Sequence, residues 1–167
     1  MNAQMLYRLA GVAALAGGAA RIFSALPVRI DPIALQWLYT AIDVLLLFGL
    51  MGLYLKRADK LGLLGFAGFA VGVAALSFIG GPDADVFGFS TYEEGAVTLA
   101  IAMAGLSIAW LRARERPLSP PICWFASVVA AGILQRLPAP LPDYGFMTAG
   151  VLFGAGFALA GWDLLRR

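Results

Sequence analysis

Residues 37–57 read WLYTAIDVLLLFGLMGLYLKR, and this stretch decides the fold that the sequence predicts. It is apolar over most of its length and ends abruptly at Lys56 and Arg57. About 20 apolar residues in a helix are enough to cross the hydrocarbon core of a bilayer. Upstream, Asp31 and Pro32 supply a capping carboxylate followed by proline at the first helical position. We therefore expect a membrane-spanning helix over residues 32–55.

The composition of the whole chain is that of an integral membrane protein. Of its 167 residues, 61% are hydrophobic and only 13% are charged, which is far more apolar than a soluble domain of this size. The net charge of +2 is too small and scattered for nucleic-acid binding. The chain has no histidine, so it lacks the commonest metal ligand and general base. We predict no metal, no cofactor and no catalytic residue, and we do not expect an enzyme.

Other apolar stretches predict five more helices. We expect them at residues 6–25, 61–79, 122–137 and 144–165, with one between the capping residues 90–94 and Arg112. In the last of these, Ser90 with Glu93, or Thr91 with Glu94, can form a capping box. The predicted fold is one all-α domain, residues 1–167, with six transmembrane helices.

The helix ends suggest three copies of one helical hairpin, at about residues 1–57, 58–114 and 115–167. Each copy has a proline break, at 25–27, 80–82 and 136–138, and a basic stop, at 52–57, 109–114 and 162–167. All three copies would have the same orientation, so we predict parallel hairpins around a pseudo-threefold axis along the membrane normal.

Lysine and arginine are distributed unequally between the two predicted membrane faces. Arg21, Arg29 and Arg136 would lie on one face. The opposite face would hold all the others, which are Arg8, Lys56, Arg57, Lys60, Arg112, Arg114, Arg116, Arg166 and Arg167. The positive-inside rule therefore places both termini in the cytoplasm. We predict a multi-pass protein of the bacterial cytoplasmic (inner) membrane.

Asp43 is the most informative residue, because it would lie near the middle of the bilayer. An ionisable side chain there costs about 2.5 to 3.5 kcal/mol, so it should face the protein interior and have a partner. Gln36, together with Tyr39 or Thr40, shares a helical stripe with Asp43, and Arg21 approaches from the end of the first helix. These five residues form the candidate intramembrane polar site.

Three interpretations of this site remain open. In the first, Asp43 and Arg21 satisfy each other and lock two helices together. In the second, the site handles protons or a solute. In the third, Asp43 is an isolated carboxyl group that stays neutral.

Two classes of function follow from these interpretations. The first is a non-enzymatic binding, accessory or sensor module, which would contact a second copy or a membrane-protein partner through its glycine and alanine faces. The second is a small-solute or proton-coupled transporter or channel, open toward the outer side at Asp43. A cavity lined by Gln36, Tyr39 and Asp43, with a further polar residue such as Thr98 or Thr148, would favour transport. A solidly packed centre would favour the module, to which we lean because the polar stripe is short.

Overall fold

The computed structural model describes residues 2–28, 31–79, 88, 90–134, 136–139 and 141–166. This described part is all-helical and contains no strand, as predicted. Five of its helices are long and apolar enough to cross a membrane, whereas α5, with 16 residues, is shorter. The six helices are α1 (Ala3–Ser24), α2 (Pro32–Leu55), α3 (Ala58–Ile79), α4 (Thr91–Ala113), α5 (Ser119–Leu134) and α6 (Leu141–Arg166).

Two helix starts follow directly from the capping residues. Asp31 is the N-cap of α2, where its carboxylate accepts hydrogen bonds from the backbone N–H groups of Ile33 and Ala34 at 3.0 and 3.2 Å. Ser90 caps α4 and accepts from the N–H of Glu93 at 3.2 Å, which selects the first of the two predicted capping registers. Both caps satisfy N–H groups that have no partner within the helix.

Four helix starts lie three residues before the predicted ones. The helix α1 begins at Ala3, because Asn2 caps it and accepts a hydrogen bond from the N–H of Gln4 at 3.3 Å. The helix α3 begins at Ala58, before the apolar pattern, with a short first turn that is separated from the rest by a kink at Gly62, where the backbone is non-helical at φ 59° and ψ −164°. Both α5 and α6 begin three residues early, since a proline in the first turn lacks only an N–H that would be unpaired there. The expected break at residues 80–82 lies outside the described residues.

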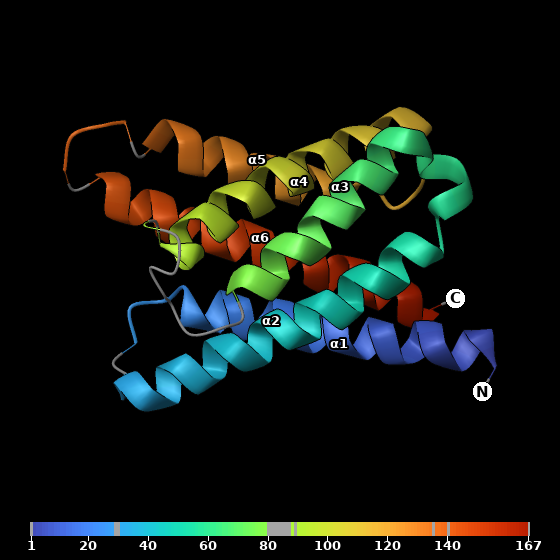
Figure 1. Cartoon of the computed structure of the whole chain (residues 1–167), viewed down its shortest axis with the longest axis horizontal. Coiled ribbons are helices and arrows are strands. Elements are labelled where there is room, and N and C mark those ends of the chain that lie inside the picture. Colours follow the sequence, from blue (N-terminus) through green and yellow to red (C-terminus); the bar gives the residue numbers. More distant parts are fainter. Residues whose placement is uncertain are drawn as a thin grey trace.

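The six helices form a closed ring in chain order, in which α6 returns to pack against α1 (Figure 1). Successive helices run in opposite directions, so α1 begins and α6 ends at the same end of the bundle (Figure 1). We call this end, which holds both termini, the proximal end. The distal end is the opposite one, where α1, α3 and α5 end and α2, α4 and α6 begin.

The contacts around the ring are unequal. Each predicted hairpin is a closely packed pair, yet the most extensive contact joins α1 to α6, while α2–α3 and α4–α5 are slighter. Glycines explain the α1–α6 contact: a Cβ at Gly18 would lie 2.6 Å from the backbone nitrogen of Ala158, and one at Gly161 would lie 2.6 Å from that of Leu15. The contacts between neighbouring helices are therefore unequal around the ring, and the pseudo-threefold axis stays a prediction.

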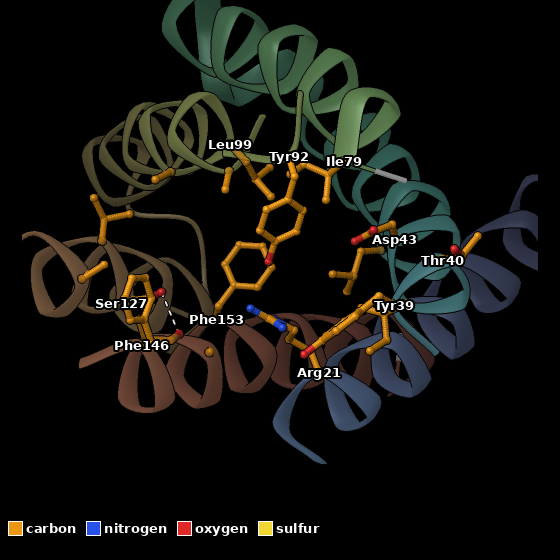
Figure 2. A pocket seen from close by; sticks show the side chains of 18 of the residues that line it. Arg21, Tyr39, Thr40, Asp43, Ile79, Tyr92, Leu99, Ser127, Phe146 and Phe153 are labelled. Carbon is orange, nitrogen blue, oxygen red and sulfur yellow. Dashed lines mark hydrogen bonds between the residues drawn. The ribbon is translucent and has the colours of Figure 1, made fainter. Parts of the chain in front are cut away.

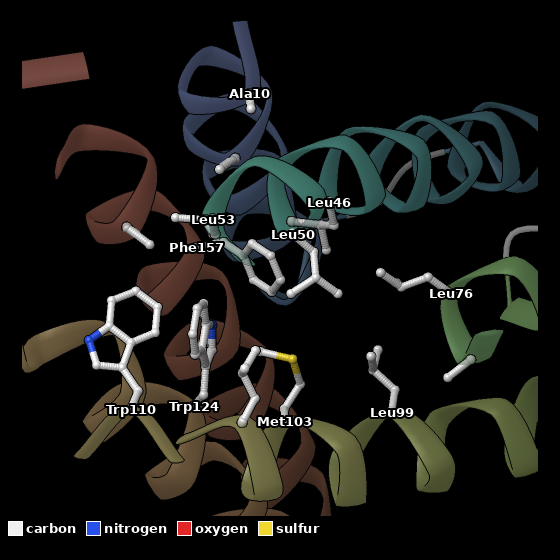
Figure 3. Close-up of a cluster of buried hydrophobic side chains, with 14 of the residues drawn as sticks. Ala10, Leu46, Leu50, Leu53, Leu76, Leu99, Met103, Trp110, Trp124 and Phe157 are labelled. Atoms are coloured by element: carbon white, nitrogen blue, oxygen red, sulfur yellow. The ribbon is translucent and has the colours of Figure 1, made fainter. Parts of the chain in front are cut away.

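The proximal half of the ring is filled by a hydrophobic core. Trp124 packs edge-on against Trp110, with ring centroids 5.8 Å apart, and contacts Phe157 at 5.0 Å. Leu50 and Met103 extend this cluster from α2 and α4, and both are fully buried (Figure 3). The centre of the bundle is therefore solid toward the termini.

An ion pair closes the proximal end. Arg57, which is 2% exposed, binds Asp163 of α6 at 2.6 Å, and its guanidinium lies over the Trp110 ring at 4.1 Å from the centroid. The Trp110 indole N–H donates to the carbonyl of Glu115 at 2.8 Å. These contacts tie the turn between α2 and α3 to α4 and α6.

Candidate functional site

A cavity of about 290 Å³ occupies the distal half of the ring, and each of the six helices contributes to its lining (Figure 2). Its volume is at the lower end of the range of small-molecule sites, which is roughly 300 to 1,000 Å³. The cavity ends where the proximal core begins, because Leu46 and Leu99 belong to both. These two leucines, with Phe153 packed beside them, form its floor.

The cavity brings together all five residues of the predicted polar site: Arg21, Gln36, Tyr39, Thr40 and Asp43. The sequence reasoning anticipated this grouping because four of them follow one another at helical spacing on α2. Arg21 joins them from the last turn of α1. Thr98 instead lines a separate pocket between α3 and α4.

Arg21 is held by its own helix and by Tyr39. Its Nη1 donates to the Ser24 hydroxyl at 3.4 Å, and this hydroxyl donates to the Arg21 carbonyl at 3.0 Å. The guanidinium lies over the Tyr39 ring, 5.9 Å from its centroid. A cation in this position is attracted to the face of the aromatic ring.

Asp43 faces the same space from α2, as Figure 2 shows. No hydrogen bond or ion pair joins Asp43 to any described residue, so the direct Arg21–Asp43 pair of the first interpretation is not formed. The physical reason is that Ser24 and Tyr39 hold the guanidinium instead. The cavity therefore presents a carboxylate and a guanidinium that do not neutralise each other by direct contact.

The other polar groups of α2 in the cavity differ in their availability. The Thr40 hydroxyl donates to the Gln36 carbonyl at 3.1 Å, so its proton is already used. Gln36 is exposed, and it lies two turns before Asp43 toward the distal end. An amide there can both donate to and accept from a solute that enters the cavity.

The opposite side of the cavity is mostly apolar and was not predicted. Ala100, Phe146 and Phe153 line it from α4 and α6, and the Ser127 hydroxyl beside them donates to the Ala149 carbonyl at 2.8 Å. At the rim, Tyr92 is 46% exposed and Phe146 is 59% exposed. The described part of the cavity therefore reaches the surface at the distal end.

The sequence reasoning also missed the ion pair of the proximal end. The sequence places Arg57 in the basic stop that ends a helix, and the structure buries this side chain against Asp163. Asp163 is the residue that could have indicated this pair. It is an acidic residue within the last basic stop, at the predicted membrane face where most lysine and arginine residues gather. The distance of 106 residues between the partners hid their contact.

Acidic and cysteine side chains of the described residues do not gather into a group that could hold a metal ion. The cavity offers one carboxylate, one guanidinium, an amide and two tyrosines beside an apolar wall. Such a set can bind a small molecule through charge and hydrogen bonds while its apolar part rests on the wall.

Comparison of the chain with protein-family models, with curated proteins and with solved structures finds no match.

Proposed function

We propose that the chain is a multi-pass protein of the bacterial cytoplasmic membrane, with six spans and with both termini and the proximal end in the cytoplasm. Support comes from the five long apolar helices and from large apolar side chains on the outer surface of the ring, such as Leu63 (83% exposed) and Ile101 (66% exposed). The helix α5 is about 24 Å long at 1.5 Å per residue, a shortfall that local thinning of the bilayer can accommodate.

The orientation is testable by cysteine labelling in a Cys123→Ser background. Val28→Cys, at the distal end, should react with a membrane-impermeant thiol reagent added to intact cells. Asp59→Cys, at the proximal end, should react only after the cells are opened. The reverse pattern would contradict the orientation.

We propose further that the protein is a non-enzymatic binding module, which takes a small solute into the distal cavity from the outer side. The observation that carries this proposal is a distal cavity that all six helices line and that holds two charged side chains, but that ends on the packed core of the proximal half and does not cross the bundle. Charged groups placed inside a membrane protein are costly and mark sites for ions or solutes.

Ligand-dependent stabilisation tests this function. A ligand that binds the folded protein raises its free energy of unfolding, by about 2.7 kcal/mol at a concentration of 100 times its Kd. The purified protein is heated in detergent with amino acids, amines, carboxylates and sugars, each added alone. We expect at least one of them to raise the melting temperature.

A matched pair of variants places the effect in the cavity. Ala100→Phe fills the cavity wall, whereas Ala70→Phe makes the same change at an exposed position of α3. The stabilising solute should lose its effect on Ala100→Phe and keep it on Ala70→Phe. The proposal is wrong if none of the solutes stabilises the protein or if Ala100→Phe responds as the unsubstituted protein does.

A second candidate function is transport of the same solute. The observation that favours it lies below the cavity floor, where Ser107 Oγ and Trp124 Nε1 are buried without a hydrogen-bond partner among the described residues. Unpaired buried polar atoms cost about 1 to 3 kcal/mol each, and a path for a polar solute is one reason to keep them. Uptake of the stabilising solute into proteoliposomes would establish transport. Binding of the solute without uptake would favour the non-enzymatic binding module.

A contact with a second copy or with another membrane protein stays part of the module proposal. The glycines of α1 and α6 do not serve it, because Gly11, Gly18, Gly154 and Gly161 pack against the neighbouring helix of the same chain. Gly132 of α5, which has open space around it, is a better position for such a contact.

A further inference from the structure

We infer that the solute of the distal cavity is a small zwitterion, whose cationic group binds Asp43 and whose anionic group binds Arg21. This inference rests on the proposed binding function and specifies its ligand class. It starts from the two charges of the cavity, which line the same space from different helices without direct contact.

The charges of the lining are balanced. Among the described residues that line the cavity, Arg21 carries the positive charge and Asp43 the negative charge. A solute with a single charge would satisfy one of these side chains and leave the other without compensation. An uncompensated charge away from water is destabilising, whereas a solute that carries both charges satisfies both side chains.

The Arg21 guanidinium is held away from the Asp43 carboxylate, so the two groups do not form an ion pair. Arg21 donates to Ser24 and lies over Tyr39, which together hold its guanidinium on the α1 side of the cavity. Asp43 has no such contact with any described residue, so its carboxylate can accept hydrogen bonds from a solute. The site is therefore preorganised for a ligand with separated charges, and binding does not first require an ion pair to break.

The rest of the cavity selects for an apolar body of limited size. Phe146 and Phe153 lie on the side of the cavity away from Asp43 (Figure 2), and Ala100 belongs to the same lining. A volume of about 290 Å³ suits a molecule of a few carbon atoms beyond its charged groups. A neutral polar solute would gain from the amide of Gln36 but would leave both charges unused.

The test uses solutes that differ only in charge. Leucine carries both charges, 3-methylbutylamine is leucine without its carboxylate, and 4-methylpentanoate is leucine without its ammonium group. A second set, 5-aminopentanoate with pentylamine and pentanoate, has a longer distance between the charges. Binding of each to the purified full chain in detergent is measured by calorimetry at pH 7.

At least one zwitterion should bind about tenfold or more tightly than both of its single-charge analogues, since one hydrogen bond to a charged group is worth about that factor. Asp43→Asn should abolish the advantage of the zwitterion over the carboxylate. Arg21→Gln should abolish its advantage over the amine. The control Asp59→Asn, at an exposed position of the proximal end, should change none of these ratios.

The inference is overturned if, in both sets, the amine or the carboxylate binds as tightly as the corresponding zwitterion, or if both zwitterions fail to bind. It is also overturned if Asp43→Asn and Arg21→Gln keep the preference. Failure of the inference alone is recognisable, because another solute, such as a sugar, would then still stabilise the protein and still be excluded by Ala100→Phe. If no solute meets that criterion, the binding function fails as well.

Discussion

The two ends of the bundle hold the same pair of side chains in opposite arrangements. At the proximal end, Arg57 and Asp163 bind each other at 2.6 Å and the guanidinium is covered by Trp110. At the distal end, Arg21 and Asp43 line one cavity and do not pair directly. An arginine and an aspartate in an apolar chain can therefore form a structural ion pair or, as we propose for the distal end, the charged groups of a binding site. The side chains that hold the arginine decide between the two roles.

The largest effect on stability is expected at the buried Arg57–Asp163 ion pair. Asp163→Asn leaves the buried Arg57 guanidinium without its counter-charge, and loss of one partner of a buried pair costs about 3 to 5 kcal/mol. We expect a marked decrease of the melting temperature in detergent. The double variant Arg57→Gln with Asp163→Asn should recover part of the loss, because it removes both charges. An unchanged melting temperature for Asp163→Asn would contradict the structural role.

A smaller effect is expected where α1 meets α6, the contact that runs along both halves of the ring. Gly18→Ala would place a Cβ 2.6 Å from the backbone nitrogen of Ala158, so the two helices must move apart. Overpacking of this kind costs about 1 to 3 kcal/mol. Gly105→Ala is the matched control, since only Leu64 Cδ1, at 3.9 Å, lies within 4 Å of its Cβ position, and it should be neutral or slightly stabilising. Equal melting temperatures for the two variants would show that α1 and α6 are not in close contact.

The smallest effect on stability is expected at Asp43. Because Asp43 makes no direct contact with Arg21, Asp43→Asn should change the free energy of unfolding by less than about 1 kcal/mol while it abolishes the advantage of the zwitterion over the carboxylate. The measurement is the melting temperature of Asp43→Asn and Asp163→Asn in parallel. If Asp43→Asn lowers the melting temperature as much as Asp163→Asn, and the added change Arg21→Gln restores it, then Arg21 and Asp43 also form a structural pair. The contrast between the two ends would then be wrong.

Much of the fold was predictable, because its determinants are local. Asp31 with Pro32 set the start of α2, Ser90 set that of α4, and apolar runs predicted six helices. The bounds of α3 and α5 were missed, since Gly62 and the prolines of α5 act through backbone conformation, which hydrophobic periodicity does not record.

The candidate site was predictable on the side formed by α2 and by Arg21 at the end of α1, and not on the side formed by α4 and α6. Gln36, Tyr39 and Asp43 follow one another on α2, so helical spacing groups them without knowledge of the fold. Phe153 and Tyr92 come from α6 and α4, and their approach to Asp43 depends on how the ring closes. The absence of the Arg21–Asp43 pair depends on the rotamer of Arg21 beside Ser24, which no sequence pattern records.

The central claim is that the distal half holds an open solute site and the proximal half does not. Two cysteines on α4, one turn apart in a Cys123→Ser background, test it most directly: Ala100→Cys in the cavity wall and Met103→Cys in the core. Both are exposed, in intact cells, to a small membrane-impermeant thiol reagent. We predict that Ala100→Cys is modified from outside and that Met103→Cys is not. Protection of Ala100→Cys, or equal modification of both, would contradict the account.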